Sequence, residues 1–262
     1  MDRPAAPAAA SRHYLMCRPT YFAVEYAINP WMDPAAGVDR ERAIRQWEGL
    51  RDLYRALGHR VSEIEPVDGR VYGARFASAE RTPEGPAYLD WFRKAGYAET
   101  REPKHVNEGE GDFITLDDVV LAATGFRTEA AAHQEAERFL GRPVVTLQLV
   151  DPRFYHLDTA LFALSGREVV YYPGAFSEGS RRVLRALYPD AVLATEEDAA
   201  VLGLNAVSAG RDVVIAAEAT ALADRLRALG RTVHPVELDE LRKAGGGAKC
   251  CTLELRDTPA PV

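Results

Sequence analysis

Cysteine is scarce in this chain of 262 residues, which contains only Cys17, Cys250 and Cys251. An odd number with two adjacent members does not build a disulfide framework and is typical of a reducing compartment. No apolar run approaches the roughly 20 residues that a membrane-spanning helix needs. The first residues also lack the apolar stretch of a signal peptide. These absences predict a cytoplasmic protein with no membrane partner.

An excess of positive charge is also lacking. The formal net charge is −7, which argues against nucleic acid as a main partner. The sequence has neither a metal-ligand pattern nor a glycine-rich phosphate loop. Hydrophobic residues make up 47% of the chain and charged residues 27%, so a core of ordinary size is expected.

The chain does contain a recurring pattern in which a helical segment stops near glycine or proline and a β-rich run follows. We expect helices at 40–57, 85–95, 129–140, 178–188 and 219–229, with stops at Gly58, Gly96, Gly141, Pro189 and Gly230. The stops recur every 38 to 48 residues, which indicates an internal repeat.

Further strands are expected between these segments, so that each unit holds two strands, a helix and a third strand. The expected strands are 14–18, 60–64, 71–76, 113–122, 144–150, 159–163, 168–172, 191–194, 212–216, 232–236 and 249–255. We predict an α/β fold with five-fold pseudosymmetry. A single domain is expected at 13–257, with flexible tails at 1–12 and 258–262. An ordinary α/β sandwich with similar element spacing is the alternative.

Cys250 follows the run Gly245-Gly246-Gly247 and is expected at the start of a strand. Glycines allow backbone and substrate to approach closely, and a thiolate can attack an electrophilic carbon. Cys251 faces the opposite side if both residues lie in a strand. One of the pair is therefore a candidate nucleophile and the other a buried structural residue, although spacing alone does not say which. Cys17 is expected in the core.

His156 differs from the other histidines because it follows a strand and a turn at Asp151-Pro152. Asp158 lies two residues on, so both side chains leave the same side of an extended backbone. An imidazole beside a carboxylate is suited to acid–base catalysis. A capping histidine and a turn aspartate are the alternative. The remaining histidines are interpreted as surface or local hydrogen-bonding residues: His13, His59, His105, His133 and His234.

Three carboxylates fall within five residues at Glu108, Glu110 and Asp112. Like charges repel, so the cluster is either a solvated acidic turn or a site in which one carboxylate orients the imidazole and another holds a cation. Arg127 and Arg81 are candidates for binding a ligand carboxylate through the guanidinium fork. A thiol, an imidazole and spare carboxylates together suit an electrophilic carbon in a positively charged group. A guanidinium is such a group.

These motifs together resemble those of the dimethylargininase and amidinotransferase superfamily of guanidino-group-modifying enzymes, the pentein fold, in its bacterial dimethylargininase-like branch. Glu108-Gly-x-Gly-Asp112 is similar to the family's Glu-Gly-Gly-Asp motif, and His156-Leu-Asp158 to its His-x-Asp motif. Gly-Gly-x-x-Cys250-x-Thr-Leu is similar to its nucleophile motif. The resemblance runs from about Met16 to Leu255, and segments 17–22 and 28–32 look like the branch's N-terminal signature.

The resemblance implies a propeller of five strand–strand–helix–strand units around a polar channel. It also implies roles. Cys250 would be the nucleophile, His156 the general acid/base, and Glu108 the motif's acid, with Glu110 as the alternative because this chain has one extra residue before the aspartate. The residues implied in substrate binding are Asp158, Asp112, Glu110, Arg127 and Arg81.

The activity that the resemblance implies is cysteine-dependent hydrolysis of the guanidinium group of arginine or N-methylarginine. It would pass through a covalent thiouronium and release citrulline with an amine or ammonia, without a metal or organic cofactor. An amidinotransferase or a deiminase-like enzyme acting on another guanidino compound is the alternative. The oligomeric state, including a homo-oligomer, stays open.

One segment departs from the family pattern. A Pro-Asp-x-Val-Phe-x-Ala-Asn stretch is missing near residue 68, where Glu65 or Asp68 would have to replace its polar groups. A non-catalytic guanidino-binding relative is therefore a further alternative.

Overall fold

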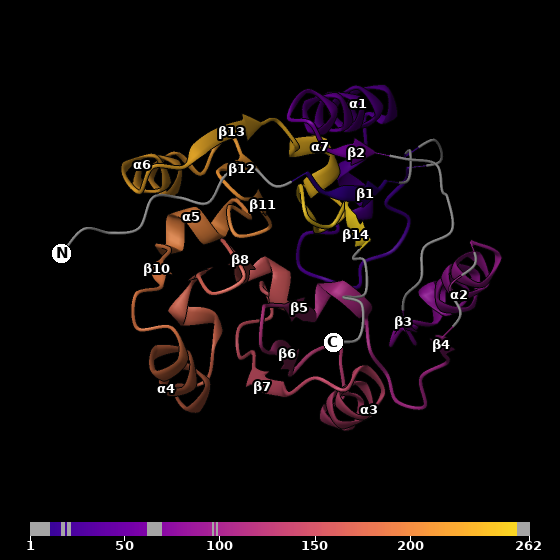
Figure 1. Cartoon of the computed structure of the whole chain (residues 1–262). Helices are drawn as coiled ribbons and strands as arrows, with labels where there is room; N and C mark the ends of the chain where they lie inside the picture. Colours follow the sequence, from indigo (N-terminus) through magenta and orange to yellow (C-terminus); the bar gives the residue numbers. More distant parts are fainter. Residues whose placement is uncertain are drawn as a thin grey trace.

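Within the part of the chain that the structure describes, five small sheets surround a common centre, and the longer helices lie outside them (Figure 1). The computed structural model describes residues 11–16, 19, 22–61, 70–95, 97 and 99–255. The α/β propeller with five-fold pseudosymmetry is therefore confirmed, and the sandwich alternative is wrong.

Three consecutive units follow the full pattern of two strands, a helix and a third strand. The first of them contains β5 (Phe113–Thr115), β6 (Val120–Thr124), α3 (Ala130–Leu140) and β7 (Val144–Gln148). The next contains β8 (Leu161–Ala163), β9 (Val169–Tyr171), α4 (Glu178–Leu187) and β10 (Val192–Leu193). The last contains β11 (Val207–Ala209), β12 (Asp212–Ala216), α6 (Thr220–Ala228) and β13 (Thr232–Val236). In each unit the first strand pair is antiparallel, and the helix connects the two parallel strands.

The N-terminal sheet is completed by the C-terminal end of the chain. β14 (Leu253–Leu255) pairs antiparallel with β1 (His13–Leu15), and β1 pairs parallel with β2 (Arg60–Val61). Between β1 and β2 lies α1 (Arg40–Ala56). This closure brings the segment that carries Cys250 back to the centre of the ring.

The remaining unit has two paired strands within the described residues. β3 (Arg70–Tyr72) pairs parallel with β4 (Glu99–Arg101), and α2 (Glu84–Lys94) connects them. An isolated bridge between Arg75 and Asn107 continues this unit toward the centre. The predicted gap around Glu65 and Asp68 lies outside the described residues.

Local sequence explains where the outer helices begin and end. The side chain of Asp39 accepts a hydrogen bond from the backbone N–H of Arg42 and so caps α1. Gly141 ends α3 in the left-handed conformation, with φ of 65°. The inward face of α1 repeats every three or four residues and buries Ala43, Trp47, Leu50 and Tyr54.

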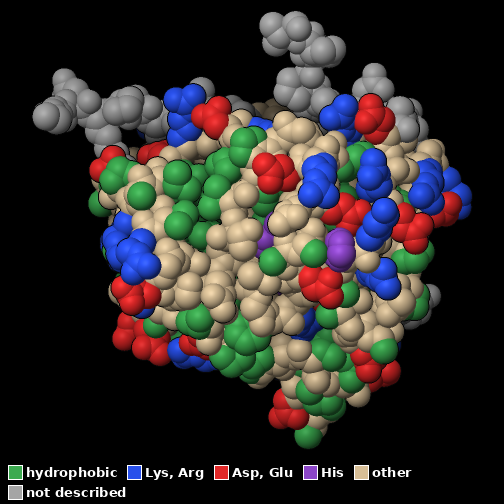
Figure 2. All heavy atoms as spheres, turned by 90° about the horizontal axis from the view of Figure 1, so that it is seen from below, with side chains coloured by type: hydrophobic (Ala, Val, Ile, Leu, Met, Phe, Trp, Pro, Cys, Tyr) green, Lys and Arg blue, Asp and Glu red, His purple; other side chains and the backbone are tan. Residues whose placement is uncertain are grey.

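Buried side chains form two main clusters under these helices. The larger joins the sheets of β5 to β13, and its fully buried members include Leu121, Leu147 and Leu161. The smaller surrounds α1 and includes the partly buried Cys251. Cys251 is thus the structural member of the cysteine pair. On the face shown in Figure 2, acidic and basic side chains are interspersed.

Short helices occupy the loops between these elements. Two are α-helical, α5 (Glu196–Ala200) and α7 (Asp239–Arg242). Five are 3-10 turns: η1 (Pro34–Ala36), η2 (Ala79–Arg81), η3 (Gly109–Gly111), η4 (Leu157–Thr159) and η5 (Pro173–Ala175). No helix in the described ranges is long and apolar enough to cross a membrane.

Several predicted elements need correction. The strand expected at 113–122 is a hairpin of β5 and the start of β6, turning at Asp117 and Asp118. The strand expected at 249–255 is only β14, so Cys250 lies in a turn at 248–251. The strands β4 and β11 were not predicted. His59 and His133 are buried and hydrogen-bonded, so of the two interpretations offered for them the hydrogen-bonding one holds.

The predicted domain bounds and tails stay a prediction, because most of the tail residues lie outside the described ranges. Ser11 donates a hydrogen bond to the carbonyl oxygen of Gly58, and Arg12 donates one to His59, so ordered contacts begin before residue 13. Cys17, Gly96 and the tail at 258–262 lie outside the described residues.

Candidate active site

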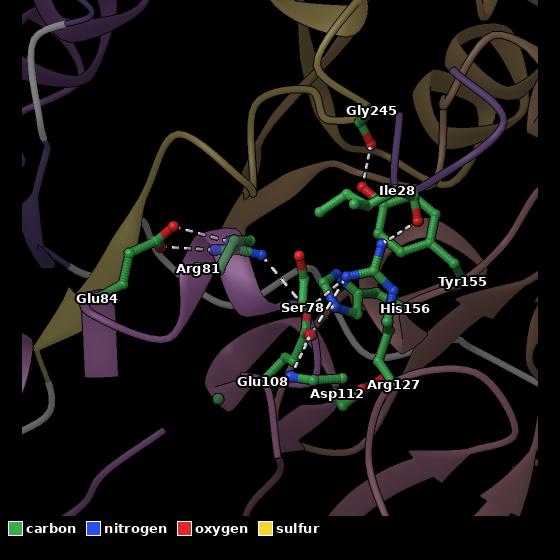
Figure 3. Close-up of polar contacts among 12 residues, drawn as sticks. Ile28, Ser78, Arg81, Glu84, Glu108, Asp112, Arg127, Tyr155, His156 and Gly245 are labelled. Atoms are coloured by element: carbon green, nitrogen blue, oxygen red, sulfur yellow. Dashed lines mark hydrogen bonds and ion pairs between the residues drawn. The ribbon is translucent and has the colours of Figure 1, made fainter. Parts of the chain in front are cut away.

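Glu108 and His156 meet at the centre of the ring, each immediately before a 3-10 turn (Figure 3). Oε2 of Glu108 lies 2.8 Å from Nε2 of His156, and both side chains are buried. Gly111 leaves room for the ring, because a Cβ there would lie 2.9 Å from Nδ1 of His156. Glu108, and not Glu110, is therefore the carboxylate that contacts the imidazole.

Two arginines contact the same carboxylate. Nη1 of Arg127 donates to both oxygens of Glu108 at 3.2 and 3.1 Å, and Nη1 of Arg81 donates at 3.4 Å. Burial alone would raise the pKa of Glu108, but His156 and the two arginines outweigh it and lower this pKa to about 2. Glu108 is therefore an anion at neutral pH.

The donors of these arginines are engaged by the protein itself. Nη2 of Arg127 donates to the carbonyl oxygen of Ile28 at 2.6 Å, and its guanidinium lies 4.8 Å from the ring centre of Tyr155. Arg81 donates to Glu84 through Nε at 2.9 Å and Nη2 at 2.8 Å. The structure thus places Arg127 and Arg81 on protein carboxylates. Their expected binding of a substrate carboxylate stays a prediction.

Asp112 connects the two 3-10 turns. It accepts a hydrogen bond from Oγ1 of Thr128 at 2.6 Å and one from the backbone N–H of Leu157 at 3.0 Å. Burial raises the pKa of Asp112 to about 6, against the opposing effects of His156 and of these hydrogen bonds. Because both oxygens are engaged, the structure gives Asp112 an anchoring position behind His156.

The charge state of His156 follows from these neighbours. Burial would lower the pKa of His156, but the negative charges of Asp112, Glu108 and Asp158 raise it above the ordinary value. A raised pKa keeps the imidazole protonated to a higher pH, as a proton donor requires.

Cys250 contacts Asp158, not His156, in the described structure. The thiol donates to Oδ2 of Asp158, with Sγ at 3.4 Å from that oxygen. Oδ1 of Asp158 is buried and has no hydrogen-bond partner in the described part of the chain. Asp158 lies within η4, so its backbone is not extended as predicted. Even so, it reaches the same centre as His156.

Two effects raise the pKa of the Cys250 thiol well above its ordinary value: burial of the sulfur and the negative charge of Asp158. Cys250 has an exposed surface, whereas Asp158 is 3% exposed. The charge of the buried Asp158 is poorly screened and adds to the effect of burial. Without a bound cation, the thiol is largely neutral near pH 7.

Asn205 is a member of the site that the sequence analysis missed. It lies in the turn between α5 and β11 and is 1% exposed. Its Nδ2 donates to Sγ of Cys250 at 3.2 Å. The signal was present, since Asn205 is the one polar side chain in the run 201–207. A buried polar group in such a run needs partners.

Two further contacts hold the cysteine segment in place. The hydroxyl of Tyr155 donates to the carbonyl oxygen of Gly245 at 2.8 Å, and the Tyr155 ring lies 4.6 Å from that of His156. Lys249 forms an ion pair with Glu110. Glu110 therefore holds the turn beside Cys250 through Lys249, whereas the imidazole of His156 contacts Glu108.

Comparison with known proteins gives close relatives over nearly the whole chain, although no family model matches it. An N(G),N(G)-dimethylarginine dimethylaminohydrolase of Mycobacterium tuberculosis is 47% identical over 271 residues, which span 97% of this chain and 89% of that protein. The bifunctional arginine dihydrolase/ornithine cyclodeaminase AgrE of Nostoc is 34% identical, with 93% of this chain matching 38% of that protein.

Solved structures also match this chain over nearly its whole length. The product-bound N-terminal domain of ArgZ, a cyanobacterial arginine dihydrolase, has a TM-score of 0.88 at 32% identity and covers 95% of this chain and 98% of its own. The same domain covalently bound to a reaction intermediate has a TM-score of 0.87 at 32% identity, over 94% of this chain and 98% of its own. This chain belongs to the dimethylarginine dimethylaminohydrolase family of guanidino-group-modifying enzymes with the pentein fold.

Proposed function

We propose that this protein is a cysteine-dependent hydrolase of the guanidinium group of arginine or N-methylated arginine, with Cys250 as the nucleophile. One observation carries the proposal: Sγ of Cys250 lies 3.4 Å from the buried carboxylate of Asp158, whose second oxygen has no partner within the described residues. A buried carboxylate with a vacant acceptor favours a cationic ligand with N–H groups.

Binding of the guanidinium prepares the nucleophile. One N–H of the substrate fills the vacant acceptor at Oδ1 of Asp158, and the positive charge offsets the effect of Asp158 on the sulfur. The pKa of the Cys250 thiol therefore falls when substrate is bound. The thiol proton is released to solvent, and the reactive thiolate then lies beside its target carbon, where reaction is effectively intramolecular.

The chemistry proceeds in two halves. The Cys250 thiolate adds to the guanidinium carbon, His156 gives its proton to the departing nitrogen, and the C–N bond breaks to leave a thiouronium on sulfur. His156 then takes a proton from water, whose oxygen attacks the same carbon, and the C–S bond breaks. The products are citrulline and ammonia, or citrulline and a methylated amine. Glu108 keeps the imidazole oriented and favours its protonated form.

The substrate needs at least one guanidinium nitrogen that carries hydrogen and can face Asp158. An ionised Asp158 can accept hydrogen bonds but cannot donate them, so the nitrogen that faces it must carry hydrogen. Arginine meets this condition, and so does asymmetrically dimethylated arginine, whose second terminal nitrogen is unsubstituted. The two curated relatives are named for reactions of dimethylarginine and of arginine respectively.

A panel of guanidino compounds tests the proposal. Arginine, monomethylarginine, asymmetric dimethylarginine, agmatine and guanidino acids are incubated with purified protein, and the ureido product is measured colorimetrically. We expect product from at least one of them, loss of product in Cys250→Ser, and retention in Cys251→Ser. Thermal stabilisation by these compounds without any ureido product would instead identify a non-catalytic binding protein.

A further inference from the structure

Asn205 uses every hydrogen-bonding site of its amide, three of them on the segment that carries Cys250 and the fourth on the backbone of Asp158. Its Oδ1 accepts from the backbone N–H of Gly247 at 2.8 Å and from that of Cys250 at 3.0 Å. Its Nδ2 donates to Sγ of Cys250 at 3.2 Å and to the carbonyl oxygen of Asp158 at 3.2 Å. An amide offers two donors and two acceptor sites, and all four are in use.

These partners fix which way the amide points. Backbone N–H groups can only donate, so the atom that faces Gly247 and Cys250 must be the oxygen. The carbonyl oxygen of Asp158 can only accept, so it must face the nitrogen. The nitrogen that faces the sulfur is thus a donor by necessity.

We propose that Asn205 is a catalytic residue of the reaction assigned above, because its Nδ2–H stabilises the Cys250 thiolate while its Oδ1 holds the cysteine turn in place. This proposal deepens the proposed function and rests on it for the kinetic consequence. Sγ lies between an anion, Asp158, and a neutral donor, Asn205. As negative charge develops on sulfur, the donor contact strengthens and the contact with Asp158 becomes repulsive.

The donor is already in place before the reaction. The Asp158 carbonyl holds Nδ2 from the other side, and the side chain is 1% exposed, so no water has to be displaced to form the contact. Preorganised donors of this kind contribute most where charge develops. In the same direction, the hydrogen bond from Asn205 lowers the pKa of the Cys250 thiol.

The turn itself depends on the same side chain. The chain folds back so tightly that a Cβ on Gly246 would lie 2.5 Å from Cβ of Cys250. At this point Oδ1 of Asn205 accepts hydrogen bonds from the backbone N–H groups of Gly247 and Cys250. A single residue 45 positions away in sequence therefore sets where the sulfur lies.

Asn205→Asp separates the two contributions. It keeps an oxygen for the two backbone N–H groups but replaces the donor at the sulfur with a carboxylate oxygen. Asn205→Ala removes both the oxygen and the donor. It is needed as a second variant because a protonated carboxyl group in Asn205→Asp would still donate to the sulfur. Ser208→Ala is the matched control, because Ser208 is also buried and donates to the Leu164 carbonyl at 2.8 Å without touching the cysteine turn.

The main readout is the pH midpoint of iodoacetamide alkylation at Cys250, located by fragment mass spectrometry so that it is distinguished from Cys251. We expect both Asn205 variants to raise this midpoint, the aspartate variant by about one pH unit or more. On the best guanidino substrate, kcat should fall roughly 100-fold with KM changed less than about threefold. Thermal melting shows that each variant is folded.

The proposal is overturned if folded Asn205 variants alkylate with the wild-type midpoint and lose no more activity than Ser208→Ala. Asn205 would then be a structural residue only. Alkylation requires no turnover, so its outcome is independent of the proposed function. If the wild type releases ureido product from none of the guanidino compounds, the proposed function is refuted. The alkylation midpoints still show whether Asn205 stabilises the Cys250 thiolate.

Discussion

Oε2 of Glu108 and Nε2 of His156 lie 2.8 Å apart, in a contact that joins two successive units of the propeller. The pKa of Glu108 is lowered to about 2, and that of His156 is raised. The pair therefore favours an anionic carboxylate with a protonated imidazole. This is the state that the proposed mechanism needs when the amine departs.

Replacing Glu108 should shift the pH dependence of the reaction. Glu108→Gln removes the carboxylate that hydrogen-bonds His156, so the pKa of His156 falls. The imidazole then loses its proton at lower pH, and the alkaline limb of the kcat profile moves toward lower pH. We expect kcat near pH 7.5 to fall roughly 100-fold.

Glu110→Gln is the matched control for this profile. Glu110 is paired with Lys249 and does not contact the imidazole, so its loss should leave the alkaline limb unmoved. Equal shifts in the two variants would refute the assignment of Glu108 as the partner of His156.

The same carboxylate should contribute to stability in acid. Because the pKa of Glu108 is lowered to about 2 from a usual value of 4.5, its contribution is present above about pH 4.5 and is lost as pH falls toward 2. Urea unfolding of wild type and Glu108→Gln between pH 5 and 3 measures this. The free energy of unfolding should fall more steeply with decreasing pH in the wild type. Parallel curves would contradict the lowered pKa.

Gly111 should be intolerant of a methyl group. In Gly111→Ala the new Cβ would lie 2.9 Å from Nδ1 of His156, so the imidazole or the turn must shift. We expect a loss of about 1–3 kcal/mol in the free energy of unfolding and a reduced kcat. Calorimetry and a steady-state assay measure the two effects.

Gly49→Ala provides the comparison, because Gly49 lies in α1 and a Cβ there meets nothing within 4 Å. Alanine in a helix interior should stabilise the protein by roughly 0.5–1 kcal/mol, with activity unchanged. If the two glycine variants behave alike, close packing of Gly111 against His156 is not what the protein requires.

The outer parts of the fold follow from local sequence. Glycine stops and apolar periodicity place α1 and α3 within one residue of their observed bounds, and β12 and β13 match the predicted ranges. Such signals are local, because the helix end and the glycine that terminates it are adjacent in the chain.

The centre of the ring was harder to predict. The turn at Cys250 resembles a strand locally, but Asn205 holds it from 45 residues away. The run 113–122 also resembles one strand, although Asp117 and Asp118 turn it into a hairpin. Local propensity does not contain such distant contacts. The motifs at Glu108, His156 and Cys250 were found, whereas Asn205 belongs to no motif.

Arg127 offers a test of two roles. If Arg127 holds the carboxylate of Glu108 in place through its contacts at 3.1 and 3.2 Å, Arg127→Lys should lower kcat for arginine and agmatine by similar factors. If it binds the substrate carboxylate, only arginine should lose affinity, because agmatine has no carboxylate. We expect the first result. A selective increase in KM for arginine would favour the second.

The most direct test of the whole account is the mass of the protein during turnover. The protein is mixed with its best guanidino substrate, quenched in acid within one turnover, digested and analysed by fragment mass spectrometry. We predict a thiouronium adduct on Cys250 that appears and decays as citrulline forms, and that is absent from Cys250→Ser. Citrulline formed without any adduct, or with the adduct on Cys251, would contradict the account.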